Sequence, residues 1–76
     1  MSLPTDFEIS SLIDRMWRSG LNLELRNISL CMASKQHVKH TDEYEKFIHT
    51  RLKAMVKAGD LRRVRFLPGR PFYNPS

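Results

Sequence analysis

The sequence has 76 residues, with 13 Lys and Arg against 8 Asp and Glu, which gives a formal net charge of +5. This length predicts one domain over residues 1–76, and the single cysteine excludes an internal disulfide. No apolar run reaches the roughly 18 residues of a membrane span and no signal-peptide pattern opens the chain, which predicts a soluble, intracellular protein of the nucleus or the bacterial nucleoid.

Residues 6–19 are predicted to form an amphipathic helix. Its apolar side chains recur at i, i+3, i+4, i+7 and i+8, which places them on one helical face. Thr5 and Glu8 have the spacing of a capping box at the start, and Gly20 suits the position just past the end. The expected buried face consists of Ile9, Leu12, Ile13, Met16 and Trp17.

The next segment predicts a short strand and then a short helix. Leucines alternate with polar residues in LNLEL, which favours a strand at residues 21–25. Asn27 is then a candidate N-cap for a helix over residues 27–34. One continuous helix from Asn22 is the alternative. The helix at 27–34 would bury Ile28, Cys31 and Met32.

A long helix is predicted over residues 42–58, after a polar connector at 35–40. Thr41 or Asp42 caps its start, Gly59 ends it, and acids in its first turn with Lys57 in its last suit the helix dipole. Its expected core face consists of Tyr44, Phe47, Ile48, Leu52 and Met55, with Arg51 at the margin. On the opposite side, a basic stripe at i, i+4, i+7 and i+11 consists of Lys46, Thr50, Lys53 and Lys57.

The C-terminal segment, residues 61–75, predicts a β-hairpin. Pro68 and Gly69 supply turn chemistry between two β-prone runs. Alternation places Val64 and Phe66 on an apolar face and the side chains of Arg63 and Arg65 on the other face. Arg62 shares the parity of the apolar face, so it is expected at the margin, with its charged end in water.

The positive charge increases toward the C-terminus. Residues 1–34 sum to −1, residues 35–60 to +2, and residues 61–76 carry four arginines without any Asp or Glu. A one-sided basic distribution is typical of a surface that binds a polyanion. The alternative is that the net charge serves only solubility.

The order of helix, short strand, helix, helix and hairpin resembles the winged helix-turn-helix superfamily. The residues that carry the resemblance are IHTRLKAMVKAGDLRRVRF and the aromatic pair Phe72 and Tyr73. In that family the third helix ends in a pattern close to L..L...G.L before a two-stranded wing. Here the pattern is matched by Leu52, Met55 or Val56, Gly59 and Leu61. The linker-histone-like subgroup is similar in length, but this chain lacks its lysine density and has an arginine-based wing.

The resemblance implies a mainly α fold with a small β-hairpin and a nucleic-acid-binding module for regulation or DNA organisation. Double-stranded DNA would be contacted by the third helix in the major groove and by the wing along the backbone or minor groove. Site-specific binding would require base contacts, a homodimer or a tethered domain. Together with the connector cations, the expected interface comprises Lys39, His40, Lys46, His49, Thr50, Lys53, Lys57, Arg62, Arg63, Arg65 and Arg70.

The acids in the first turn of the third helix conflict with this interface. A recognition helix usually presents its N-terminal turn to the groove, where Asp42, Glu43 and Glu45 would repel phosphate. The acids then only cap the helix, or the basic stripe and wing carry the contact, or the module binds an acidic protein partner within a larger assembly. RNA binding, with bases stacked on Phe72 and Tyr73, is a further alternative.

The sequence does not predict an enzyme, a cofactor or a metal site. Cys31, His37, His40 and His49 lack the paired short spacings of structural zinc ligands, and Cys31 falls on the predicted core face. No glycine-rich phosphate loop or catalytic carboxylate pair stands out. Gly69-Arg70-Pro71 is similar to the centre of an AT-hook, although Pro68 replaces the arginine of that pattern, and turn chemistry explains it equally well.

Overall fold

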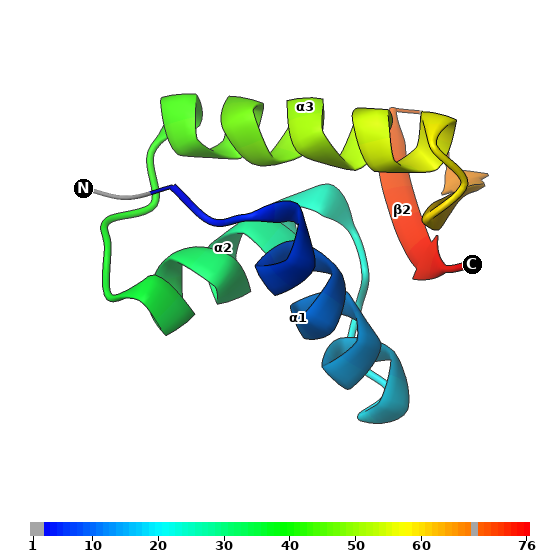
Figure 1. Cartoon of the computed structure of the whole chain (residues 1–76), viewed down its shortest axis with the longest axis horizontal. Coiled ribbons are helices and arrows are strands. Elements are labelled where there is room, and N and C mark those ends of the chain that lie inside the picture. Colours follow the sequence, from blue (N-terminus) through cyan, green and yellow to red (C-terminus); the bar gives the residue numbers. More distant parts are fainter. Residues whose placement is uncertain (1–2, 68) are drawn as a thin grey trace.

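The computed structural model describes residues 3–67 and 69–76, with the side chains of residues 65–67 outside the description. Three helices, α1 (Asp6–Arg18), α2 (Leu25–Gln36) and α3 (Asp42–Lys57), precede an antiparallel hairpin of β1 (Leu61–Leu67) and β2 (Arg70–Pro75). In Figure 1, α3 runs along one side of the molecule, α1 and α2 lie across from it, and the hairpin closes the end near the C-terminus. The prediction of a mainly α fold with a small β-hairpin is confirmed, and the arrangement is compatible with a small winged-helix-like fold.

Helix α1 begins as its capping box predicts. The Glu8 amide donates to Thr5 Oγ1 at 3.1 Å, and the Thr5 amide donates to Glu8 Oε1 at 2.9 Å. The chain leaves the helix through Gly20, whose φ of 70° favours a residue without a Cβ. The predicted core face is right except for Trp17, which is 55% exposed. Trp17 lies at the edge of the apolar stripe, and the last turn of α1 extends past the helices that cover the core (Figure 1).

The strand and helix predicted for residues 21–34 need correction. The strand reduces to one bridge between Glu24 and Phe72, joined by a hydrogen bond from the Tyr73 amide to the Leu23 carbonyl at 3.1 Å. The Glu24 amide donates to Asn22 Oδ1 at 2.7 Å, so the backbone turns there and α2 begins at Leu25. Glu24 has an extended backbone, but α2 begins at the next residue, so the predicted strand is cut to this one bridge.

Asn27 is not the N-cap of α2 but lies inside the helix. Its side-chain Nδ2 donates to the Asn22 backbone carbonyl at 2.6 Å, which ties the first turn of the helix to the preceding loop. At the other end α2 runs to Gln36 and stops at His37, whose φ of 58° is unusual for a residue with a Cβ. Of the expected buried residues, Ile28 and Met32 are fully buried and Cys31 is half-buried.

Helix α3 matches its prediction closely. Thr41 Oγ1 accepts from the Tyr44 amide at 3.1 Å, and Gly59 has a φ of 88° just beyond the end. Tyr44, Ile48, Leu52 and Met55 are buried, and Phe47 packs partly against them. An ion pair from Arg51 to Asp6 of α1, with N–O distances of 2.6 and 2.8 Å, holds the margin of this face.

The hairpin is confirmed, but its predicted inner face is wrong. Arg63 is opposite Tyr73 and Leu61 is opposite Pro75, so their side chains share one face of the sheet. Tyr73 and Leu61 are buried, hence this is the face that packs on the helices. Val64 and Arg62 lie on the outer face. The side chain that completes the core from the hairpin is that of Tyr73 and not that of Val64. The predicted orientations of Phe66 and Arg65 and the turn residue Pro68 lie outside the described part.

The core is one cluster to which all three helices and both strands contribute. Its members are Ile9, Leu12, Ile13, Met16, Leu23, Ile28, Met32, Ala33, Tyr44, Ile48, Leu52, Met55, Leu61 and Tyr73. Among the described residues, no helix has the length and apolar character needed to span a bilayer.

Candidate nucleic-acid interface

The exposed side of α3 carries the basic stripe that the sequence predicts. Lys46, Lys53 and Lys57 are all exposed, and we refer to them as the lysine ridge. Thr50 lies between them and donates its hydroxyl to the Lys46 carbonyl at 3.0 Å. Among the described residues, no carboxylate lies within ion-pairing distance of any of these three ammonium groups. The ridge therefore presents uncompensated positive charge to solvent.

Strand β1, which contacts α3, contributes further arginines. Arg62 and Arg63 are exposed, and neither is in an ion pair within the part of the chain that the structure describes. Arg63 shares the sheet face of Tyr73, which turns it toward the side of the hairpin that packs on the helices. The side chain of Arg65 is outside the described part of the hairpin.

The pKa of His49 is affected by positive charges from both the lysine ridge and β1. Burial lowers the pKa of this imidazole most, and the positive charges of Lys53 and Arg63 lower it further, against an opposing effect of Glu45. Its ring meets that of Tyr73 edge to face, with centroids 6.4 Å apart. Both effects disfavour the protonated imidazole, and the contact of His49 with Tyr73 joins α3 to the hairpin.

Arg70 differs from the other predicted wing cations because it is neutralised within the molecule. Its guanidinium donates two hydrogen bonds to the Glu24 carboxylate, at 2.6 and 3.1 Å. This pairing lowers the pKa of Glu24 and raises that of Arg70. The bridge between Glu24 and Phe72 brings the carboxylate to the start of β2. Arg70, which the sequence places in the expected interface, is therefore paired with an acid from another segment of the chain.

The connector between α2 and α3 contributes one exposed cation and one engaged imidazole. Lys39 is exposed, whereas His40 is half-buried with its Nε2 at 2.9 Å from Ser29 Oγ. The same Nε2 lies 3.5 Å from Glu45 Oε1. His40 thus joins the two helices at this corner and is not displayed beside Lys39 as a free phosphate contact.

The acids of the first turn of α3 do not all face the same way. Glu45 is half-buried and accepts from the Ser29 hydroxyl at 3.3 Å, so it is turned toward α2. Asp42 and Glu43 remain exposed at the start of α3. The uncompensated basic surface therefore begins at Lys46. The N-terminal turn of α3, which carries the exposed acids Asp42 and Glu43, does not belong to it.

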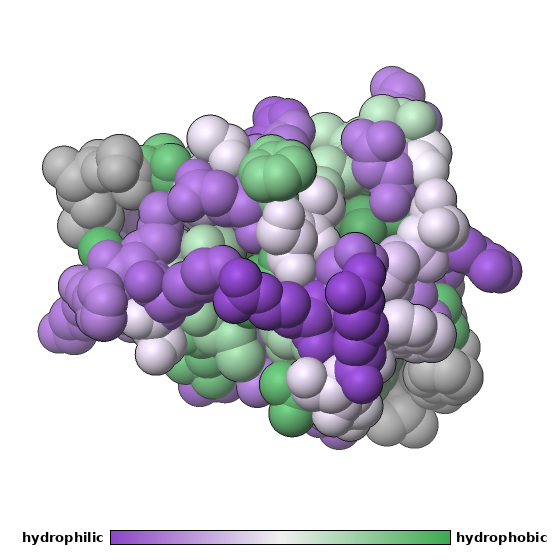
Figure 2. Space-filling view, turned by 60° about the horizontal axis from the view of Figure 1, so that its bottom comes forward, coloured by the Kyte–Doolittle hydropathy of each residue, from purple (hydrophilic) through white to green (hydrophobic). Residues whose placement is uncertain are grey.

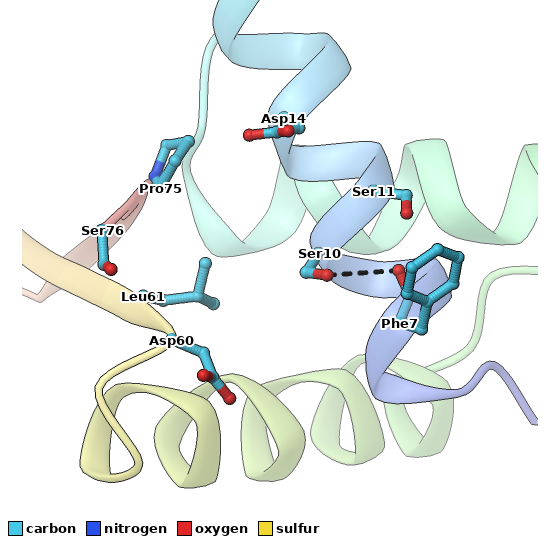
Figure 3. A pocket seen from close by; sticks show the side chains of 8 residues that line it. All are labelled: Phe7, Ser10, Ser11, Asp14, Asp60, Leu61, Pro75 and Ser76. Atoms are coloured by element: carbon cyan, nitrogen blue, oxygen red, sulfur yellow. Dashed lines mark hydrogen bonds between the residues drawn. The ribbon is translucent and has the colours of Figure 1, made fainter.

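A depression elsewhere on the molecule, shown in Figure 3, is acidic, in contrast to the basic surface of α3 and β1. It encloses about 290 Å³ between α1 and the base of the hairpin. Ser10, Ser11 and Asp14 approach from α1, and Asp60, Leu61 and Ser76 lie opposite them. Ser10 donates to the Phe7 carbonyl at 3.2 Å. Its described lining carries two carboxylates and no basic side chain, so it does not suit a phosphate.

The described side chains include no group of three or more His, Cys, Asp and Glu that could hold a metal ion. The sequence reasoning missed two acids that decide which arginines are free, Glu24 and Asp6. Each meets an arginine that is 46 or 45 residues away, so no local pattern could have revealed either pair.

The fold and the surface together define a small, mainly helical protein with an antiparallel hairpin and a basic α3–β1 face. Comparison of the chain with known proteins finds no matching family model, no matching curated protein and no matching solved structure.

Proposed function

We propose that this protein binds double-stranded DNA through the lysine ridge of α3 and the arginines of β1. The observation that supports this most directly is the contact between α3 and the hairpin, where the ring of His49 meets that of Tyr73 with centroids 6.4 Å apart and Tyr73 is opposite Arg63 on β1. A helix and a strand thus place uncompensated cations on one side of the molecule, where they fit a polymer with a regular series of phosphates. We propose that such binding would serve regulation or DNA organisation.

Phosphate contacts are expected to supply most of the affinity. Each phosphate neutralised by Lys or Arg lowers the slope of log K against log salt by about 0.9. Four or five contacts from the ridge and from Arg62 and Arg63 give a slope of roughly −4, with non-specific dissociation constants on the order of 10⁻⁴–10⁻⁶ M. A single copy is therefore a weak binder with little sequence discrimination, and specificity requires a second copy or a tethered domain.

The approach of α3 to DNA differs from that of a helix that reads bases with its first turn. Asp42 and Glu43 are exposed at that turn and repel the phosphate backbone. The favourable region begins one turn later, at Lys46, and continues past Lys57 to β1. We therefore place the middle and C-terminal part of α3, and not its N-terminus, against the duplex.

A salt titration of duplex binding tests the proposal. The variant Lys53→Ala/Arg63→Ala removes one cation from each element, and Arg26→Ala/Lys35→Ala is the matched control, since Arg26 and Lys35 are exposed on α2. The first variant is expected to make the salt slope shallower by about 1.8, and the control is expected to leave it unchanged. Equal effects of the two variants would show that net charge alone drives binding.

The nature of the polymer is decided with three probes of equal length: duplex DNA, single-stranded DNA and duplex RNA. The proposal expects duplex DNA to bind best. Tighter binding of either other probe, or no salt-dependent binding of any of them, contradicts it. In the latter case an acidic protein becomes the better candidate for the basic surface.

A further inference from the structure

A second surface, on the outer side of the hairpin, exposes large apolar side chains around a depression. Trp17 is 55% exposed and Leu21 is 52% exposed, although both belong to residue types that are usually buried. Both line the same hollow of about 420 Å³, together with Leu23, Phe72 and the amide side chains of Asn22 and Asn74. We call this hollow the aromatic groove.

Convergence on one hollow distinguishes this surface from scattered apolar exposure. Leu30, by comparison, is 40% exposed on α2 without lining a described depression. Figure 2 turns forward the side on which α1 projects in Figure 1, and it shows hydrophobic side chains exposed between strongly hydrophilic ones. Tryptophan in a hollow with a polar rim is the composition of a protein-binding hot spot.

The charges around the aromatic groove define the partner that it suits. Asp14, one turn before Trp17, is compensated by Arg18 at 3.6 Å. Glu24, next to the groove, is compensated by Arg70. Arg62 remains, because it is exposed and lies opposite Asn74 on the outer face of the sheet. The compensated pairs leave a net positive rim, which complements an acidic segment and repels a basic one.

Hydrogen-bond donors in the groove lead to the same conclusion. Asn22 Oδ1 accepts from the Glu24 amide, and the NH₂ group of the same side chain can donate to a partner. A carboxylate or a backbone carbonyl of a partner can accept from this group. The groove therefore combines apolar contact area with amide donors, and the guanidinium of Arg62 belongs to the residue opposite the lining residue Asn74. The described neighbours of the groove include no uncompensated carboxylate.

We propose that the aromatic groove docks a partner-protein segment in which bulky apolar residues alternate with Asp and Glu. An apolar side chain of the segment packs against Trp17 and Leu21, and an adjacent carboxylate pairs with Arg62. This surface consists of α1, the 20–24 loop and the outer face of the hairpin, so it is separate from the lysine ridge. The inference does not depend on DNA binding, but the two surfaces share Arg62, so a duplex and the segment would compete for this guanidinium.

The test uses a short synthetic peptide with alternating acidic and Phe or Leu residues, titrated into the ¹⁵N-labelled full chain. Shifts are expected for the Trp17 indole and for the amides around Leu21 and Asn74. Trp17→Ala is expected to weaken binding at least about tenfold, and Leu30→Ala, the matched exposed apolar residue, to leave it unchanged. Arg62→Ala is expected to weaken binding by a smaller factor.

Two control peptides separate the contributions of charge and apolar contact. One keeps the acids and carries Ala at the apolar positions; the other keeps the apolar residues and carries Lys in place of the acids. Both are expected to bind at least tenfold more weakly than the first peptide. Equal binding of the all-acid control, with shifts along α3, would overturn the inference, because the lysine ridge would then be the docking surface.

Self-association is a further outcome that would overturn it. If sedimentation shows a dimer that Trp17→Ala converts to a monomer, the occupant of the groove is a second copy of this chain. The duplex affinity of Trp17→Ala is measured in parallel and is expected to equal that of the unmodified chain. Loss of peptide binding with intact DNA binding, or the reverse, shows which of the two proposals has failed.

Discussion

Arg63 and Arg70 belong to the same hairpin and have opposite electrostatic surroundings. Arg63 lies opposite Tyr73, whose ring meets that of His49 on α3, and within the described structure it has no ion-pair partner. Arg70 donates two hydrogen bonds to Glu24. The comparison teaches that the number of arginines in a basic segment does not measure its capacity to bind a polyanion. What counts is which guanidinium groups the fold leaves uncompensated.

The largest expected effect is a difference in duplex affinity between variants of these two arginines. Loss of one phosphate contact with a slope of about 0.9 corresponds to roughly eightfold weaker duplex binding near 0.1 M salt. Arg63→Ala is expected to lose about this factor, and Arg70→Ala less than about twofold, because its charge is already paired with Glu24. Fluorescence anisotropy with one labelled duplex measures both. Equal losses of duplex affinity in the two variants would contradict the proposed difference between a free and a paired arginine.

If Arg70 loses its ion pair with Glu24, its guanidinium should become free to contact phosphate, as that of Arg63 is. Glu24→Gln removes the carboxylate and leaves the guanidinium free, so duplex affinity is expected to rise by a factor of up to about eight near 0.1 M salt. Asp14→Asn, which removes one acid and frees Arg18 on α1, away from the lysine ridge, is the matched control. An equal gain in the control would show that only net charge had changed.

The compensated pairs predict a pH dependence of stability that the open cations do not share. Hydrogen bonding to Arg51 lowers the pKa of Asp6 below its ordinary value of 3.8, and Arg70 lowers that of Glu24 below 4.5. Because the folded-state pKa values are depressed, this stabilisation is present above the ordinary values and is lost as pH falls through the lowered ones.

The double variant Asp6→Asn/Glu24→Gln should therefore lose less stability between pH 5 and pH 2 than the unmodified chain does. Urea denaturation at several pH values measures this difference. Asp42→Asn/Glu43→Gln, with two exposed acids outside the described ion pairs, is the control and should retain the steeper pH dependence. Parallel curves for all three proteins would contradict the proposed contribution of the pairs.

Tyr73 carries a buried polar group that, unlike the paired acids, has no described hydrogen-bond partner. Its ring is fully buried, and its hydroxyl is the buried polar side-chain atom that has no hydrogen-bond partner in the described structure. Burial raises the pKa of this phenol, with a smaller opposing effect of Arg63. Tyr73→Phe is expected to stabilise the fold by about 1 kcal/mol, since it removes an unsatisfied buried group. Urea denaturation tests this, and a clear loss of stability would reveal a partner for the hydroxyl.

The smallest effect concerns His37, which ends α2 with a φ of 58°. A left-handed conformation costs a residue with a Cβ about 1–2 kcal/mol, and glycine avoids it at some cost in unfolded-state entropy. His37→Gly is expected to raise the free energy of unfolding by about 0.5 kcal/mol and to leave duplex affinity unchanged. Thermal unfolding and anisotropy measure the two quantities. A loss of duplex affinity would place His37 in the interface with Lys39.

Much of the local structure could be predicted, and the errors share one physical origin. The capping box of α1, the Thr41 cap and the glycines after α1 and α3 depend on residues a few positions apart, and all are confirmed. The lysine ridge follows from helical periodicity in the same way. Trp17, by contrast, was expected in the core, because periodicity shows which face a residue takes but not where the neighbouring elements end.

By itself, the sequence determined the spans of α1 and α3, the hairpin and the gradient of positive charge toward the C-terminus. These properties arise from neighbouring residues, whose interactions survive in any packing of the elements. Only the tertiary structure decided that Arg70 and Arg51 are compensated, that Arg63 shares a face with Tyr73, and that Trp17 and Leu21 meet at one groove. Electrostatic compensation and burial depend on distances in space, which the chain sets only when segments far apart in sequence come into contact.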